Sequence, residues 1–390
     1  MTTAADFAPY AFGEGLSSTT LREFFVWCAR QSVSDIHIQG GNHLVVGQQG
    51  RLRKASEFVL ADDTWSKLLD EVFNPEIRAT VRGGRPVDRA LQLDGDINQR
   101  YGLSRGERLR FRCNFVQATA GRLDTTIALT MRVIPSEITE LTALGLEHEL
   151  FEALLPASGL GLIGGVTGSG KSTLAAAIYR FCLDTDQDRK ITTTEDPIEF
   201  ILGRAGDVLP PTQLQINRDV ATYAEGIRAH LRRAPSIIGV GEMRDLETFQ
   251  AGILAGQLGH FNLSTLHIHS PGEAIPRCLT MVPSEMREAT ARDMLGVLQY
   301  IVVQKLLRTT DGKRQAVREY IIIDDALRAK LASMPYTEWG QHIDGIIRQE
   351  QRRFADHAWR LYQAGRIDHR ELAVAMTPSQ LRELEQQARA

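Results

Sequence analysis

Cysteine is scarce in this sequence, and the cysteines that are present lie far apart. The 390 residues include four, Cys28, Cys113, Cys182 and Cys278, and none of them forms a C-x-x-C pair. This spacing argues against a zinc site and favours reduced thiols in a cytosolic protein.

A long apolar run and an excess of charge of one sign are also missing. No apolar stretch approaches the roughly 20 residues that cross a bilayer, and the first residues lack a basic segment followed by an apolar one. We therefore expect a cytoplasmic protein that meets a membrane only through partners. The formal net charge of −3 gives no general attraction to nucleic acid.

The texture of the chain changes near residue 146. After this point apolar runs alternate with helical periodicity, which is typical of an α/β fold. The runs that predict strands are 160–164, 191–194, 237–240, 261–266 and 317–323. We predict a flexible N-terminus at 1–18, an N-terminal domain at 19–133, a linker at 134–145, an α/β domain at 146–325 and a C-terminal helical region at 326–390.

Two predicted strands in the N-terminal domain carry arginines on one side. Arg110 and Arg112 alternate with apolar residues in 108–115, and Arg132 does so in 126–133. Because side chains alternate with period two, an antiparallel pairing would put these arginines on one sheet face. The residues alone favour a solvated outer face over a functional one.

The segment from Gly165 to Thr173 reads GVTGSGKST and matches the P-loop pattern completely. Backbone N–H groups of such a loop, with the positive pole of the following helix, bind phosphate. Lys171 would reach the β- and γ-phosphates, and the Ser172 hydroxyl would bind Mg²⁺. The nucleotide-binding residues that we predict are Gly165, Thr167, Gly168, Ser169, Gly170, Lys171, Ser172 and Thr173.

Acidic residues follow two of the predicted strands. Glu195-Asp-Pro-Ile-Glu199 comes after 191–194, and Glu242 comes after 237–240. Strand ends beside a P-loop are where the ligand of an α/β domain lies. Carboxylates at this place can hold Mg²⁺ and orient the attacking water of a nucleotide hydrolase.

Two histidines follow the next predicted strand. His267 and His269 are spaced i, i+2, so they would share one strand face. A phosphate sensor, a metal pair and ordinary polar residues at a strand end all explain this spacing. The spacing alone puts the metal pair behind the other two interpretations.

Together these segments resemble the secretion ATPase superfamily of type II and type IV secretion systems and type IV pili. GVTGSGKST resembles its Walker A motif, TTTEDPIEF its Asp box, IIGVGEMRDLET its Walker B motif and STLHIHSP its His box. SDIHI and MRVIPS resemble two signatures of its N-terminal domain. The resemblance runs from about residue 20 to 380, is nearest to the PilT-like branch, and includes features similar to DotB-type and TraJ-like ATPases of type IVB secretion and conjugation.

The resemblance implies an α/β fold with a PAS-like α+β N-terminal domain, a RecA-like P-loop ATPase core and C-terminal helices. It implies ATP and Mg²⁺ as cofactors, a homohexameric ring and inner-membrane components of a secretion, conjugation or pilus machine as partners, without direct nucleic-acid binding. Glu199 would be the general base, and Glu242 would bind Mg²⁺ partly through water. His267 would be the His-box residue, and the phosphate charge would be stabilised by Arg110, Arg112 and Arg132.

Some positions depart from parts of the superfamily. Gly241 stands where most Walker B motifs have aspartate, as is usual in this family, and the tetracysteine zinc motif of the assembly branches is absent. The retraction signature AIRNL is not matched at 325–331. We therefore expect a motor for type IVB secretion or conjugation, with a pilus-retraction motor as the alternative.

Two other classes compete with a motor ATPase. A nucleic-acid-binding RecA-like protein would need a basic, aromatic-lined groove, and no such cluster is present in the sequence. A component that uses ATP only as structural support would not need both Glu199 and Glu242.

Overall fold

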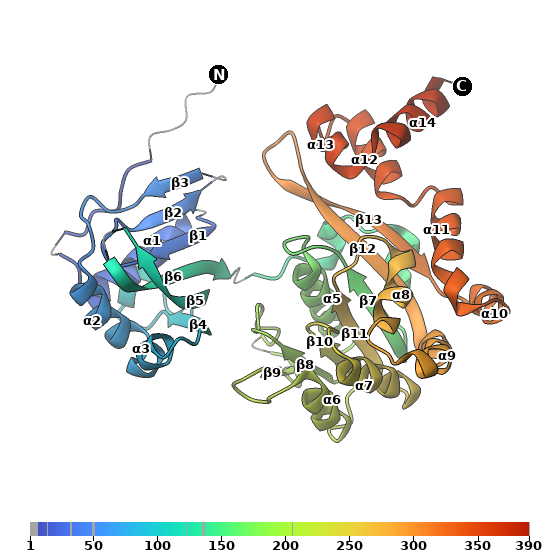
Figure 1. The fold of residues 1–390 in the computed structure, drawn as a ribbon, viewed down its shortest axis with the longest axis horizontal. Coiled ribbons are helices and arrows are strands. Elements are labelled where there is room, and N and C mark those ends of the chain that lie inside the picture. Colours follow the sequence, from blue (N-terminus) through green and yellow to red (C-terminus); the bar gives the residue numbers. More distant parts are fainter. Residues whose placement is uncertain are drawn as a thin grey trace. The chain divides into compact units, whose positions relative to one another are not determined.

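The computed structural model describes residues 7–13, 15–31, 33–48, 51–121, 123–134, 137–204 and 206–389. The chain divides into two compact units, Met1–Glu137 and Ile138–Ala390 (Figure 1). The boundary falls inside the predicted linker at 134–145, of which residues 135 and 136 lie outside the described part. From Ile138 onward this segment packs in the second unit, because Ile138 and Leu141 are buried in its core.

The first unit is built on an antiparallel sheet. In the described residues it has six strands in the order β3-β2-β1-β6-β5-β4. The strands are β1 (Asp35–Ile38), β2 (Val45–Gln48), β3 (Arg51–Lys54), β4 (Val87–Asp94), β5 (Arg108–Ala120) and β6 (Leu123–Ile134). The helices are α1 (Ser18–Arg30), α2 (Asp62–Val72) and α3 (Pro75–Arg82), with a 3-10 turn at Arg100–Gly102.

The described residues near the start of the chain pack against α1. Positions 1–6 and 14 lie outside the described residues, but Tyr10 and Phe12 pack against Phe24 of α1, with ring centroids 5.6 and 5.5 Å away. Ser17 caps α1, since its hydroxyl accepts from the backbone N–H of Thr20. Burial of these aromatic side chains against the core favours an ordered segment.

The second unit contains a mainly parallel sheet. Its described residues form seven strands in the order β13-β12-β7-β11-β10-β8-β9, and only β13 runs antiparallel to its neighbour. The strands are β7 (Gly159–Gly164), β8 (Ile191–Glu195), β9 (Thr212–Gln215), β10 (Ile237–Val240), β11 (Phe261–Leu266), β12 (Leu298–Arg308) and β13 (Arg314–Ile322). The five predicted strands are present, whereas β9 and β12 were not predicted.

Helices cover both faces of this sheet. Leu160 and Leu162 of β7 lie in one core with Phe249 of α7, while Ile163 lies in another with Leu174 of α5. Since side chains of a strand alternate between faces, α5 and α7 pack on opposite sides. The α-helices of this unit that precede β12 in the chain are α4 (His148–Ala153), α5 (Lys171–Thr185), α6 (Tyr223–Leu231), α7 (Leu246–Gln257), α8 (Ala274–Leu279) and α9 (Arg287–Val297).

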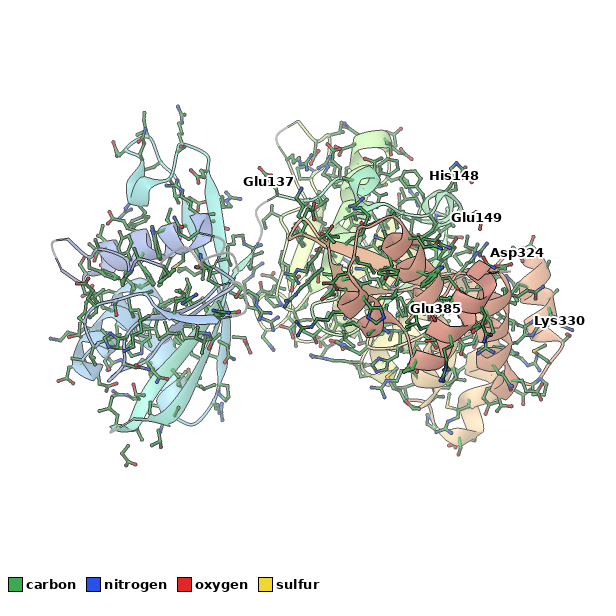
Figure 2. The ribbon with its side chains drawn as sticks, turned by 90° about the horizontal axis from the view of Figure 1, so that it is seen from above. Glu137, His148, Glu149, Asp324, Lys330 and Glu385 are labelled. Carbon is green, nitrogen blue, oxygen red and sulfur yellow. The ribbon has the colours of Figure 1, made fainter. Side chains whose placement is uncertain are left out.

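The C-terminal region is helical and packs on the last two strands. Phe354 and Ala358 of α12 share a core with Val317 and Ile321 of β13. Asp324 precedes α10 as its N-cap, and Figure 2 marks it at one side of the second unit. The helices are α10 (Asp325–Ala332), α11 (Trp339–Gln349), α12 (Phe354–Gln363), α13 (His369–Ala375) and α14 (Pro378–Arg389). Among the helices of the described residues, none has the length and apolar character that crossing a bilayer requires.

Candidate nucleotide-binding site

The P-loop connects the buried strand β7 to the start of α5. Gly165 and Gly170 have φ angles of +142° and +87°, which L side chains rarely adopt. A Cβ on Gly165 would lie 2.4 Å from Ser169 Oγ, so no larger residue fits this turn. Among the described side chains none caps α5, which leaves the N–H groups of its first turn for a ligand.

Gln304 of β12 holds the P-loop through its side-chain amide. Its Nε2 donates to the carbonyl of Ser169 at 2.8 Å, and its side chain is only 2% exposed. A Cβ on Gly170 would approach Gln304 Nε2 to 2.9 Å. The neighbouring strand therefore fixes the curvature of the P-loop.

The Lys171 amine is directed into the curve of the loop. Its Nζ donates to the carbonyls of Gly165 at 2.7 Å and Val166 at 3.1 Å. Burial lowers the pKa of Lys171, while the nearby carboxylates of Glu242 and Glu199 act in the opposite direction. The structure thus brings the predicted lysine and both predicted glutamates into one site.

The carboxyl ends of the parallel strands meet beside the loop. Glu242 follows β10 and His267 follows β11, and Glu242 Oε1 lies 3.5 Å from His267 Nε2. The segment after β10 is fixed on both sides, because Gly241 N donates to Thr194 O at 2.8 Å and Met243 N donates to Thr265 O at 3.0 Å. This pairing explains why two residues distant in sequence come together.

The two histidines do not act as a pair. Both are exposed, with the buried Ile268 between them, and both follow β11 rather than lying within it. His267 faces Glu242, whereas the backbone N–H of His269 donates to Glu273 Oε2 at 2.7 Å. Only His267 is therefore part of the site.

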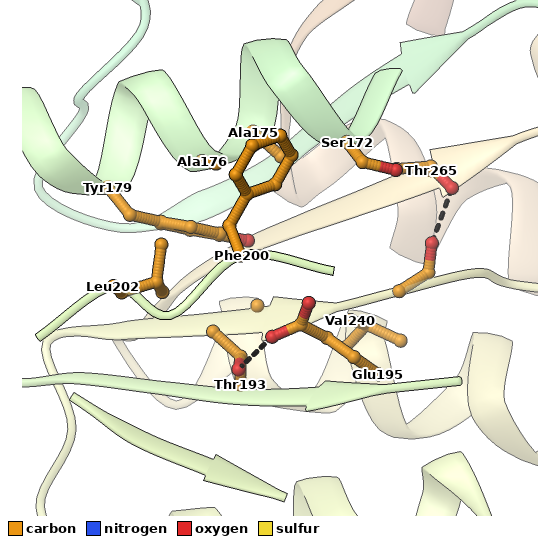
Figure 3. A pocket seen from close by; sticks show the side chains of 12 residues that line it. Ser172, Ala175, Ala176, Tyr179, Thr193, Glu195, Phe200, Leu202, Val240 and Thr265 are labelled. Carbon is orange, nitrogen blue, oxygen red and sulfur yellow. Dashed lines mark hydrogen bonds between the residues drawn. The ribbon is translucent and has the colours of Figure 1, made fainter. Parts of the chain in front are cut away.

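The segment after β8 carries Glu199 and closes a small cavity against α5. The cavity has a volume of about 50 Å³ and is lined by residues that include Ser172, Tyr179, Glu195 and Phe200 (Figure 3). Burial raises the pKa of Glu195, against the lowering effect of hydrogen bonds from Thr193 and Gln213. Glu195 is thus a partly buried carboxyl that lines the cavity against α5.

The three predicted arginines share one sheet face of the first unit. Arg112 of β5 lies directly opposite Arg132 of β6, and Arg110 is two residues along on β5. Arg132 forms an ion pair with Asp35 of β1 at 2.9 Å, whereas Arg110 is buried and Arg112 is exposed. The face is therefore partly occupied by internal contacts and partly open.

The residues present fit a nucleoside triphosphate with Mg²⁺. A glycine loop, an uncapped helix start and a half-buried amine suit phosphate, and the buried Ser169 Oγ has no partner in the described structure. The exposed Ser172 hydroxyl and Glu242 supply oxygen atoms of the kind that Mg²⁺ prefers. The fold and this site define a P-loop nucleotide-binding protein.

Comparison with known proteins identifies the family. The family model described as type II/IV secretion system protein matches residues 28–387. The pilus retraction ATPase PilT of Pseudomonas aeruginosa is 31% identical over 310 residues, covering 79% of this chain and 84% of PilT. The chain therefore belongs to the type II/IV secretion ATPase family.

Solved structures agree with this assignment. The ATPase DotB of Legionella pneumophila has a TM-score of 0.80 at 29% identity, covering 92% of this chain and 95% of DotB. The pilus retraction motor PilT with bound ADP has a TM-score of 0.77 at 28% identity, covering 93% and 99%. These similarities confirm the predicted family, its PilT-like branch close to DotB, the RecA-like α/β fold with C-terminal helices, and nucleotide binding as a family property.

Sequence reasoning missed the residues that support the site. Gln304 is a single polar residue inside the apolar run IVVQKLL, and this interruption was a signal for a buried polar contact. Gln213 lies on the short edge strand β9 after two prolines, where the sequence gives no comparable signal. Arg180 also belongs here, because it anchors the loop after Glu199 to α5.

Proposed function

We propose that this protein is a Mg²⁺-dependent ATPase that works as a homohexamer and powers a type IVB secretion or conjugation apparatus. The observation that carries the proposal is that the Lys171 amine lies near both Glu199 and Glu242 at the strand ends. The resemblance of the motifs to DotB-type and TraJ-like ATPases, and the structural similarity to DotB, support the particular machine. The protein would act in the cytoplasm, bound to the inner membrane through partners and without direct nucleic-acid contact.

Each predicted side chain has a role that follows from its chemistry. Lys171 and the loop N–H groups bind the β- and γ-phosphates, with Gly165, Thr167, Gly168, Ser169, Gly170 and Thr173 shaping the loop. Ser172 binds Mg²⁺ directly and Glu242 binds it partly through water. When bound, Mg²⁺ offsets the negative charge of the phosphates.

Glu199 acts as the general base that takes a proton from the attacking water. His267, which faces Glu242, senses the state of the terminal phosphate from the end of β11. Arg110, Arg112 and Arg132 stabilise phosphate charge from the N-terminal domain, as arginines do in other phosphoryl-transfer sites.

Steady-state hydrolysis of ATP by the purified protein tests the proposal. We expect Mg²⁺-dependent turnover that falls about 10²–10³-fold in Lys171→Ala, because the charge that stabilises the phosphates is removed. Lys330→Ala, an exposed lysine on α10, is the matched control and should leave turnover unchanged. Turnover that requires single-stranded DNA would instead support a nucleic-acid-dependent enzyme.

A pilus-retraction motor is the second candidate. The observation that favours it is the 31% identity to the retraction ATPase PilT, which this chain matches over 84% of the length of PilT. Expression in a bacterium that lacks its own retraction ATPase distinguishes the two. Restored pilus retraction would favour this candidate over secretion or conjugation.

A further inference from the structure

We propose that Gln213 is a positioning residue for ATP hydrolysis, because its side-chain amide holds the segment that carries Glu199. The inference rests on the proposed function and adds a residue that acts through the backbone around the general base. Gln213 lies on β9, the edge strand of the second sheet, directly beside Thr193 of β8.

The amide of Gln213 makes three hydrogen bonds, one to Glu195 at the end of β8 and two to the segment that follows. Its Nε2 donates to Glu195 Oε1 at 3.0 Å and to the carbonyl of Phe200 at 2.8 Å. Its Oε1 accepts from the backbone N–H of Leu202 at 2.9 Å. Because two partners are oxygen acceptors and one is an N–H donor, they fix a single orientation of the amide.

Side-chain bonds hold this segment, those of Gln213 together with the bond from Arg180 to the carbonyl of Leu202. Residues 196–204 form neither helix nor strand, so no regular backbone ladder holds Glu199. On the other side of Glu199 the backbone N–H of Ile198 donates to Gln215 Oε1 at 3.4 Å. Two glutamines of one short strand therefore hold the chain on both sides of the proposed base.

Two of the hydrogen bonds of Gln213 go to backbone groups of buried residues. Phe200 is 6% exposed and Leu202 is 2% exposed, and both line the cavity against α5 (Figure 3). Water competes poorly for the backbone groups of buried residues, so a lost bond would leave them unsatisfied. The chain would shift to find new partners, and Glu199 would shift with it.

Replacing Gln213 by leucine tests the role. Gln213→Leu keeps a similar size but removes all three bonds, and we expect kcat to fall about 10- to 100-fold while ATP affinity changes less than about threefold. A displaced base slows the chemical step, whereas the phosphate-binding loop is untouched. The measurements are steady-state kcat and equilibrium binding of a fluorescent ATP analogue.

The matched control is Gln315→Leu on β13, the strand at the opposite edge of the same sheet. Gln315 is partly buried and its Oε1 accepts from Arg366 at 3.1 Å. This change should leave kcat as in the wild type. Gln213→Glu is a second variant of the same size, in which an ionised carboxylate cannot donate to Phe200, so kcat should fall here too.

A double variant separates positioning from general support. If Gln213 acts through Glu199, adding Gln213→Leu to Glu199→Gln should leave the residual turnover unchanged, because the base is already lost. A further fall by the same factor as in the wild-type background would overturn the positioning role and indicate a structural one.

The failure of this inference is distinct from the failure of the proposed function. Wild-type kcat in folded Gln213→Leu and Gln213→Glu would overturn the positioning role and leave the ATPase intact. Absence of turnover in the wild-type protein would overturn the proposed function and the positioning role with it. Normal turnover in Glu199→Gln would overturn the choice of Glu199 as the base, and with it the positioning role, but not the ATPase function.

Discussion

Two carboxylic acids only four residues apart, Glu195 and Glu199, have different surroundings. Glu195 is held between Thr193 and Gln213, and burial raises its pKa. Glu199 lies on the irregular segment that follows. It is near enough to Lys171 for its carboxylate to raise the pKa of the lysine amine. This difference supports Glu195 as a structural carboxyl and Glu199 as the one that meets water.

Glu199→Gln should retain ATP binding and lose hydrolysis by about 10²–10⁴-fold, because an amide cannot take the proton of the attacking water. Equilibrium nucleotide binding and single-turnover hydrolysis measure the two effects separately. Glu247→Gln is the control and should behave as the wild type. Glu247 lies on α7, and its exposed carboxylate pairs with Arg228 of α6. Loss of binding in Glu199→Gln, with normal turnover in Glu242→Gln, would show that the two roles are reversed.

At the scale of elements, the loop between β8 and β9 is anchored to the P-loop helix by a buried ion pair. Arg180 of α5 lies 2.8 Å from Asp207, and both side chains are almost fully buried. Arg180 also donates to the carbonyl of Leu202 at 3.0 Å, and its hydrogen bonds hold the pKa of Asp207 below the usual range. The loop that follows Glu199 is therefore tied to α5.

Arg180→Met should lower the free energy of unfolding by about 3–5 kcal/mol, because it removes the ion-pair partner of the buried Asp207 side chain. Urea denaturation of the purified protein measures this change. Combining Arg180→Met with Asp207→Leu should recover much of the lost stability, because a buried site usually tolerates an apolar pair of similar volume in place of an ion pair. Arg292→Ala serves as control, because its ion pair with Glu288 at 3.0 Å is exposed. Equal unfolding free energies for Arg180→Met and the wild type would refute the anchor.

A partly buried carboxyl of β13 contacts the start of α12. Glu319 of β13 accepts from the backbone N–H of Phe354 at 2.9 Å. Burial raises the pKa of Glu319 to about 7; Asp344 and Asp356 also raise it, whereas the Phe354 N–H and Lys305 lower it. Glu319 therefore binds a proton more tightly in the folded protein than in the unfolded chain.

This shift predicts that Glu319 makes the protein less stable as pH rises. An acid whose pKa is raised on folding binds more protons in the native state between its unfolded value near 4.3 and the folded value, so stability falls across that window. Glu319→Gln should gain relative to the wild type by up to roughly 3 kcal/mol between pH 4.5 and pH 7.5. Denaturation at both pH values measures the gain, with the exposed Glu338→Gln as control. An equal difference from the wild type at both pH values would contradict it.

At the scale of the whole molecule, the chain has two units, each with its own core. The P-loop and the glutamates belong to the second unit, and the arginine face belongs to the first. The role that we propose for the arginines would make hydrolysis depend on residues of both units, which would couple chemistry to domain movement.

Arg112→Ala should slow hydrolysis by roughly 10³-fold or more if this side chain reaches phosphate, since arginines in that role contribute this much. Arg132→Ala should do the same, although its ion pair with Asp35 must be given up for it to reach the nucleotide. Arg108→Ala, on the same strand and paired with Asp94, is the control. The measurements are kcat and ring size by light scattering. Normal turnover in both variants, with the oligomeric state of the wild type, would assign these arginines to a solvated face.

The sequence by itself determined the parts that depend on short-range patterns. GVTGSGKST required glycines where φ is positive, and the runs 237–240 and 261–266 became β10 and β11 because uniformly apolar residues suit a strand buried on both faces. The order of the motifs was enough to recognise the family. The strand β12 was missed because it follows α9 without a turn signal.

Only the tertiary structure decided which polar residues support the site. Gln213, Gln304 and Arg180 lie far in sequence from the groups they hold, and their bonds arise from strand order and helix packing rather than from local pattern. The same cause separated His267 from His269, because the pairing of β10 with β11 places Glu242 beside only one of them. Contacts between distant segments carry no periodic signal, so they emerge only when the chain is folded.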